Sequence, residues 1–278
     1  MGAVFTENFI VQRLIDMKWI GKGQVFEDEH AYRLAQVFES LRIACVELEE
    51  FYTRIRSSKV IPTEPHPRFF PSCTQFTNQE TKELETFEYL EPLTLYRKAP
   101  FLVRLKSGKK AVVKFVARYG VAAHQALAGS GQAPNLLFFG SLDGTRDERQ
   151  HSGEGIKKPF GIHLGPPRMV VMEWVDGAHG EAATAEEKPD NAYEQVKSMV
   201  ENLHNLGFVF GDLRPPNVVF REKKAYLVDF DWAGKHGDAC YPLGIGEAIT
   251  KFAPGAEDLE PIEKEHDLQL LEHYFKKM

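Results

Sequence analysis

Three side chains in one short stretch of the sequence have the types and spacing that phosphoryl-transfer chemistry uses. Asp212 stands five residues before Asn217, and Asp229 follows twelve residues later. An aspartate can accept or orient an attacking hydroxyl, while an asparagine and a second aspartate can hold magnesium on phosphate groups. Each piece alone is common, so the prediction depends on their combination.

Two apolar runs lie between Asn217 and Asp229. Residues 218–220 and 225–228 are rich in strand-forming side chains, and a charged Arg-Glu-Lys-Lys turn joins them. This pattern predicts a β-hairpin. Asp229 then directly follows the second strand of the hairpin.

A helix is expected just before the Asp212 loop. Asn191, with Glu194 three residues later, resembles a capping box, and Gly207 is a typical helix stop. The apolar residues between them predict one buried face: Val196, Met199, Val200, Leu203 and Leu206. Such a helix would deliver the Gly211-Asp212 turn in a fixed position.

The chain upstream reads as strands. Residues 101–105 and 111–116 predict a strand, a turn and a second strand, and Lys114 lies inside the second apolar run. A buried ammonium is costly unless it is paired or bound to an anion, whereas a lysine pointing to water needs no partner. A short helix at 122–127, a strand at 136–139 and a buried-type strand at 169–174 are expected to follow.

The order of these elements resembles the protein-kinase-like superfamily. Asp-x-x-x-x-Asn, a short hairpin and Asp-Phe match its catalytic and metal loops, downstream of an Ala-Val-Val-Lys strand. The resemblance implies an α+β, two-lobed fold, with a small antiparallel-sheet N-lobe and a mainly helical C-lobe. The wording Val-Lys-Phe-Val-x-Arg-Tyr-Gly and Val-Asp-Phe-Asp-Trp-Ala-Gly looks most like divergent fungal kinase-like proteins with a short C-lobe.

The expected domain division follows from this resemblance. Residues 1–82 would form an N-terminal helical extension, and residues 83–278 the kinase-like domain. Within that domain the N-lobe would span about 83–172 and the C-lobe about 176–278.

The resemblance also implies roles for residues of the C-lobe. Asp212 would position or deprotonate the acceptor hydroxyl, and Arg214 would neutralise charge on the transferred phosphoryl group. Asn217 and Asp229 would coordinate Mg²⁺. These roles describe an ATP- and magnesium-dependent phosphotransferase acting on a protein or small-molecule hydroxyl.

Nucleotide-binding roles follow for the N-lobe in the same way. Lys114 would contact the α- and β-phosphates of ATP. Met172 would sit behind the adenine, and the backbones of Glu173 and Val175 would hydrogen-bond to it. An ordinary core strand accounts for the apolar pattern around Met172 equally well.

Several residues depart from the usual kinase pattern. Phe210 and Gly211 stand where His and Arg are common, and Asp231 replaces the Gly of Asp-Phe-Gly. The stretch 93–100 lacks the glycines of a phosphate loop, and the short helix offers His124 or Gln125 where a glutamate usually pairs with the lysine. Asp229 could itself supply that counter-charge. The alternative is therefore a pseudokinase that acts as a nucleotide-binding or scaffold module.

Two histidines outside these motifs are expected to be structural. His124 is interpreted as a satisfied packing histidine. His266, with Asp267, could support the catalytic loop from a terminal helix, although a solvated helix face is the favoured interpretation. The polar stretch 143–168 is expected to be an inserted loop.

A long helix is expected near the N-terminus, over residues 29–56. Its apolar positions alternate spacings of four and three: Leu34, Phe38, Leu41, Cys45, Leu48, Tyr52 and Ile55. The stripe either packs on its own domain, which is favoured, or makes a dimerising coiled coil. A partner contact through this helix remains open.

Net charge, the length of the apolar runs and the cysteines limit the expected partners and compartment. A formal charge of −6 gives no electrostatic case for nucleic acid, and no apolar run is long enough to span a membrane. Three scattered cysteines fit neither a disulfide framework nor a zinc site, so a reducing, cytoplasmic compartment is expected.

Overall fold

The computed structural model describes residues 2–5, 9–12, 27–55, 70–94, 100–142, 144 and 167–276. The chain divides into two compact units, residues 1–71 and 72–278, which are described separately. The first unit holds an antiparallel hairpin of β1 (Gly2–Phe5) and β2 (Phe9–Gln12), followed by α1 (Glu27–Ile55).

Helix α1 confirms the helix predicted over 29–56, but several of its apolar side chains are exposed. Phe38 is 63% exposed, and Leu48 and Tyr52 are also accessible to solvent. Within the first unit these three side chains are not buried. The partner contact through this helix stays a prediction.

The second unit begins with one antiparallel sheet of six strands. Its order is β3-β4-β5-β6-β8-β7, and all neighbouring pairs are antiparallel. The strands are β3 (Gln75–Thr77), β4 (Leu84–Pro92), β5 (Phe101–Leu105), β6 (Lys110–Val116), β7 (Leu136–Gly140) and β8 (Arg168–Glu173). The predicted strands at 101–105, 111–116, 136–139 and 169–174 are thus confirmed, to within a residue or two at their ends.

Strand β3 places the start of this unit earlier than the sequence suggested. Gln75–Thr77 pair with Leu84–Thr86, and Phe76 is fully buried against Phe87 and Phe138. The compact unit therefore starts at Ser72 rather than near residue 83. A three-residue strand carries too short a pattern to be found by alternation alone.

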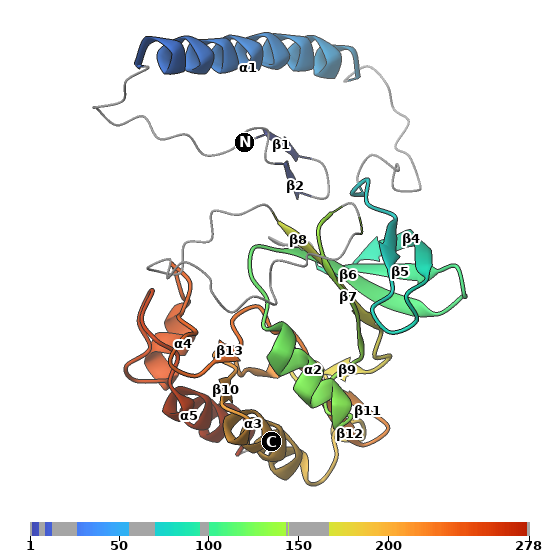
Figure 1. Ribbon diagram of the computed structural model, residues 1–278, viewed down its shortest axis with the longest axis vertical. Helices are drawn as coiled ribbons and strands as arrows, with labels where there is room; N and C mark the ends of the chain where they lie inside the picture. Colours follow the sequence, from blue (N-terminus) through green and yellow to red (C-terminus); the bar gives the residue numbers. More distant parts are fainter. Residues whose placement is uncertain are drawn as a thin grey trace. The chain divides into compact units, whose positions relative to one another are not determined.

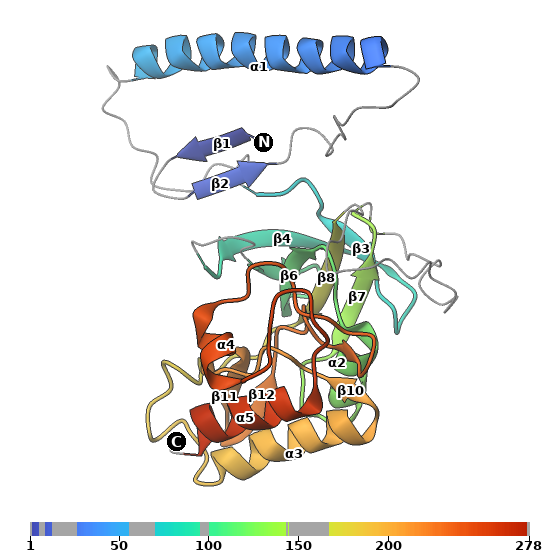
Figure 2. The same cartoon turned by 90° about the vertical axis from the view of Figure 1, so that its left-hand side faces the viewer.

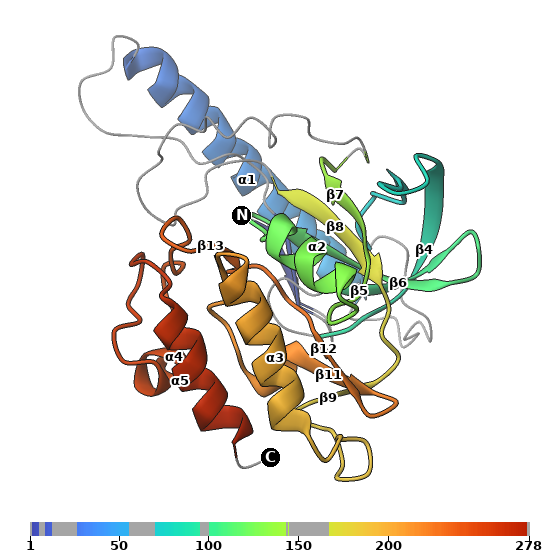
Figure 3. The ribbon, with the colours of Figure 1, turned by 60° about the horizontal axis from the view of Figure 1, so that its bottom comes forward.

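Helices form the other lobe of the second unit. They are α3 (Ala192–Asn205), α4 (Glu247–Phe252) and α5 (Lys264–Phe275), and α3 packs beside α5 (Figures 1 and 3). Helix α2 (Val121–Gly129) contacts both β7 and α3, so it lies between sheet and helices (Figure 2). The α+β, two-lobed fold expected from the sequence is observed.

Short strands complete the helical lobe. The predicted hairpin is confirmed as β11 (Val218–Arg221) and β12 (Lys224–Leu227), with β9 (Ala178–His179) along the other edge of β11. Glu222 and Lys223 form its turn with positive φ angles of 50° and 62°. Strands β10 (Phe208–Val209) and β13 (Gly234–Lys235) pair on either side of the Asp212 loop in sequence.

Two predictions about α3 were wrong in detail. Asn191 precedes the helix but its side chain caps no backbone N–H; instead it accepts a hydrogen bond from Gln195 Nε2 at 2.8 Å. Leu206 is exposed, because the helix ends at Asn205 and the chain turns away at Gly207, whose φ is +80°. Val196, Met199, Val200 and Leu203 are buried as predicted.

The predicted loop 143–168 and residues 95–99 of the stretch before β5 lie almost wholly outside the described residues. Among the described helices, none combines the length and apolar character needed to cross a membrane.

Candidate active site

A buried carboxylate on α5 anchors the backbone just before Asp212. Asp267 is fully buried and accepts hydrogen bonds from the backbone N–H groups of Phe210 at 2.8 Å and Gly211 at 2.7 Å. His204 Nε2 lies 3.0 Å from the same carboxylate. The solvated helix face favoured for His266 and Asp267 was therefore wrong: both side chains are buried.

Gly211 is required at the turn before Asp212. Its φ is +82°, a conformation that glycine adopts without steric cost. A Cβ atom at this position would lie 2.7 Å from Ile262 Cδ1. The residue that stands where kinases commonly have arginine is thus favoured by its positive φ, and a larger residue would also require Ile262 to shift.

Asp212 and Asn217 contact each other directly. Asn217 Nδ2 donates to Asp212 Oδ2 at 2.9 Å and to the Asp212 carbonyl at 2.8 Å. The short 3-10 helix Pro215–Asn217 makes this turn, and the Val228 N–H donates to the Asn217 carbonyl at 2.9 Å. Because its amide nitrogen is committed to Asp212, Asn217 keeps its side-chain oxygen as the atom that could bind a cation.

Arg214 and burial set the electrostatics of Asp212. Arg214 Nε lies 2.9 Å from Asp212 Oδ1, and Asp212 is 5% exposed. Burial raises the pKa of Asp212 to about 6, the nearby Asp229 adds to this, and Arg214 and Asn217 oppose it. A carboxylate with a pKa near neutrality is suited to accept a proton from a hydroxyl.

The side chain of Lys114, on β6, reaches the loop that follows β12. It is 7% exposed, on β6, and its Nζ lies 2.7 Å from Asp229 Oδ1. Burial alone would lower the pKa of Lys114, but the carboxylates of Asp229 and Asp231 raise it above its ordinary value. Lys114 in turn holds the pKa of Asp229 below its ordinary value, although burial opposes this. The counter-charge expected from Asp229 is confirmed.

Asp229 has a left-handed backbone conformation. Its φ is +67°, which is uncommon for a non-glycine residue and is best tolerated by Asp and Asn. Such strain persists where the surroundings fix the conformation, and it is frequent at functional sites. Here the Gly120 N–H donates to the Phe230 carbonyl at 2.8 Å, which fixes the peptide group between residues 230 and 231.

His124 is a packing residue, as the sequence indicated. It is fully buried; Nδ1 lies 2.8 Å from the Tyr119 hydroxyl and Nε2 lies 2.7 Å from the Pro134 carbonyl. Its ring stacks on Phe230 with centroids 4.5 Å apart, and burial lowers the pKa of His124 to about 4. A neutral ring therefore occupies the side of Phe230 that faces α2.

The strand expected to contact adenine is in place at β8. Met172 is buried in a cluster with Val112 and Phe139, and Glu173 is partly exposed. The Glu173 N–H already donates to the Asn135 carbonyl at 3.0 Å, so only its carbonyl remains for a ligand. Val175 follows the strand and is partly exposed.

The chemistry of this donor set fits magnesium. Asp229 and Asn217 offer oxygen atoms, which Mg²⁺ prefers, and phosphate oxygens and water usually complete its octahedron. Among the described residues no cluster of three or more His, Cys, Asp or Glu side chains could hold a metal by itself. A site with one carboxylate and one amide therefore depends on a phosphate ligand.

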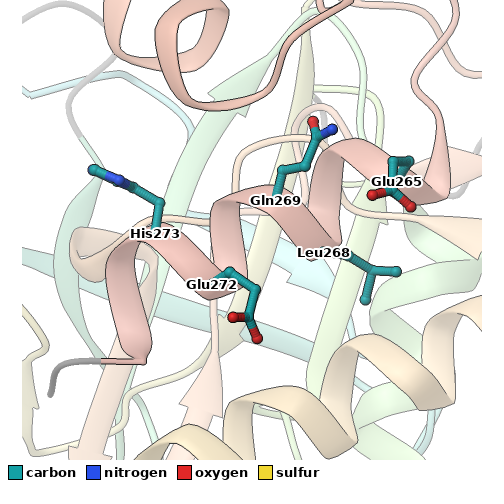
Figure 4. A pocket seen from close by; sticks show the side chains of 5 residues that line it. All are labelled: Glu265, Leu268, Gln269, Glu272 and His273. Atoms are coloured by element: carbon teal, nitrogen blue, oxygen red, sulfur yellow. The ribbon is translucent and has the colours of Figure 1, made fainter.

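A cavity of about 620 Å³ lies elsewhere, on α5. Figure 4 shows its lining side chains on that single helix: Glu265, Leu268, Gln269, Glu272 and His273. None of the site residues predicted from the sequence lines it. The contacts of its lining side chains do not indicate a catalytic or binding role.

Comparison with known proteins supports the protein-kinase-like class that the sequence resembles. The chain is 27% identical over 116 residues to the RIO-type serine/threonine-protein kinase Rio1 of Haloferax volcanii, covering 40% of this chain and 34% of that protein. It is also 27% identical over 103 residues to the KEOPS complex subunit Bud32 of Pyrococcus abyssi, covering 36% of this chain and 46% of that protein. The matched segments thus span about a third and about a half of these relatives.

No family model matches the chain. Among solved structures, the Cydia pomonella granulovirus kinase PK-1 aligns with a TM-score of 0.46 and 17% identity, over 66% of this chain and 65% of that one. The similarity to the two curated relatives supports a relationship to the protein-kinase-like superfamily.

Proposed function

We propose that this protein is an ATP- and Mg²⁺-dependent phosphotransferase that acts on a hydroxyl of a protein or small molecule. The observation that carries the proposal is two contacting pairs, Lys114 with Asp229 and Asn217 with Asp212, whose loops are joined where the Val228 N–H donates to the Asn217 carbonyl. The narrower resemblance to divergent fungal kinase-like proteins with a short C-lobe remains a prediction. The three cysteines form no disulfide, which suits the proposed cytoplasmic setting.

Each residue has a task in this proposal. Asp212 accepts or orients the proton of the acceptor hydroxyl, and Arg214 carries positive charge to the transferred group. Asn217 and Asp229 hold the magnesium, which supplies charge neutralisation on the phosphates when bound. Lys114 binds the α- and β-phosphates, with Met172 behind the base and the backbones of Glu173 and Val175 along its edge.

Replacing Lys114 tests nucleotide binding directly. For Lys114→Met we expect the affinity for Mg-ATP to fall by about tenfold or more, because a charge-assisted contact to phosphate is lost. Lys110→Met, at the exposed start of the same strand, is the matched control and should bind as the wild type does. Isothermal titration with ATP, with and without Mg²⁺, measures both.

The outcomes separate the two functions. Absence of nucleotide binding by the wild type would overturn the proposal. Binding without turnover of any hydroxyl acceptor, or of water, would favour the pseudokinase alternative, in which the same site binds nucleotide but serves as a scaffold.

The pH dependence should report Asp212. The base works only when ionised, so kcat/KM should rise as pH increases through about 6 and level off above it. The charged groups that face Asp212 are Arg214 and Asp229. Turnover measured from pH 5 to 8 checks this, and a flat profile would contradict the role of base.

A further inference from the structure

Lys114 lies against two carboxylates rather than one. Its Nζ is 2.7 Å from Asp229 Oδ1 and 2.6 Å from Asp231 Oδ1. The side chains of Lys114 and Asp231 are 9% and 19% exposed, so this second pair is largely shielded from water. One buried ammonium needs one counter-charge, and the second carboxylate therefore calls for an explanation.

Helix α2 offers no acidic partner to Lys114. Its sequence, Val121–Gly129, contains no Asp or Glu, and its polar residue nearest Phe230 is the neutral His124. Both nitrogens of His124 are engaged by Tyr119 and Pro134. Among the described residues, the carboxylates that neutralise Lys114 come from positions 229 and 231 alone.

Asp231 is anchored to the same lobe as Lys114. Arg118, four residues after Lys114, donates from Nε to the Asp231 carbonyl at 3.0 Å and from Nη1 to the Cys240 carbonyl. The Gly120 N–H holds the neighbouring Phe230 carbonyl. The backbone at 230–231 is thus tied to the connection between β6 and α2, which keeps the Asp231 carboxylate beside Lys114.

We propose that Asp231 is a positioning residue that keeps Lys114 paired when Asp229 turns to the magnesium. This inference rests on the proposed function of Asp229 as a metal ligand. With one carboxylate, the metal and Lys114 would compete for the same oxygens. With two, each cation has its own carboxylate, and Lys114 stays directed at the phosphates.

Thermal unfolding of the ligand-free protein tests the pairing. Asp229→Asn and Asp231→Asn alone should each lower Tm by no more than about 3 °C, because the other carboxylate still neutralises Lys114. The Tm of the double variant should decrease by roughly 5–10 °C more than the sum of the two single decreases, because Lys114 is then buried without a counter-charge. In a Lys114→Met background this excess should disappear.

If the Tm decrease of the double variant equalled the sum of the decreases of Asp229→Asn and Asp231→Asn, the proposal would be overturned. The measurement uses neither nucleotide nor turnover, so it decides the pairing even if the proposed phosphotransferase activity is absent. Asp238→Asn, an exposed aspartate further along the same segment, is the matched control and should leave Tm unchanged.

Kinetics supply the second readout. For Asp231→Asn we expect the KM for Mg-ATP to rise about tenfold while kcat changes less than about threefold, since the reacting groups themselves are intact. An unchanged KM, or a loss confined to kcat, would contradict a role in holding Lys114.

Discussion

Asp229→Ala should reduce Mg²⁺-dependent ATP turnover by about a thousandfold, which corresponds to about 4 kcal/mol of lost transition-state stabilisation. Positioning and electrostatics carry most of phosphoryl transfer, and this carboxylate is the only acidic metal ligand in the proposed site. The fold should survive, because Asp231 still pairs with Lys114 at 2.6 Å. Release of ADP, followed at saturating Mg²⁺, measures the loss.

The left-handed backbone at Asp229 calls for a second variant. Alanine is strained at φ +67°, whereas asparagine tolerates this conformation. Asp229→Asn should therefore keep the wild-type Tm to within about 3 °C and still lose most of the turnover. Asp238→Ala serves as the surface control. If Asp229→Asn kept turnover within tenfold of the wild type, the metal role would be wrong.

Asp267→Ala should produce the largest loss of stability among single substitutions of the site. It leaves the buried N–H groups of Phe210 and Gly211 without an acceptor, at about 1–3 kcal/mol each. Two such groups cost about 2–6 kcal/mol, so for a unit of this size we expect Tm to fall by roughly 4–24 °C. Turnover should fall as well, because the turn that carries Asp212 loses its support.

The same helix provides a control for Asp267. Glu265→Ala removes an exposed carboxylate two residues earlier and should change Tm by less than about 2 °C. Circular dichroism melts and turnover at a temperature well below Tm separate loss of folding from loss of positioning. A Tm for Asp267→Ala within about 2 °C of the wild type would contradict the anchoring role.

The sequence predicted those parts of the protein that local patterns encode. Apolar runs rich in strand-forming residues indicated the strands and the hairpin before Asp229, and the lysine inside one such run indicated Lys114. The spacing of Asp212 and Asn217 predicted a pair that the structure joins by hydrogen bonds. In each case the pattern lies within one short stretch of the sequence.

Contacts across long sequence separations entered the sequence analysis only as possibilities: Asp229 as a counter-charge for Lys114, and support of the Asp212 loop from His266 and Asp267. Asp267 bonds backbone groups more than fifty residues away, and no side-chain motif records such a bond. A clue existed: Asp267 stands beside the apolar face formed by Leu270 and Leu271, where a solvated carboxylate would be out of place. Asp231 was recognised as a departure from Asp-Phe-Gly, but its pairing with Lys114 required the fold.

Local capping rules failed at Asn191 for a related reason. Its side chain accepts from Gln195, and Gln195 also reaches the backbone of Lys223 and Ala225 in the hairpin. A tertiary link between α3 and the hairpin replaced the local capping bond.

The anchoring of the turn before Asp212 through main-chain amides has a consequence for which residues this turn tolerates. Asp267 contacts peptide N–H groups, which every residue except proline possesses, so it imposes no side-chain identity at position 210. At position 211 the positive φ angle favours glycine whatever side-chain chemistry the turn uses. The turn before Asp212 can therefore be kept without the His and Arg that kinases commonly have at these two positions.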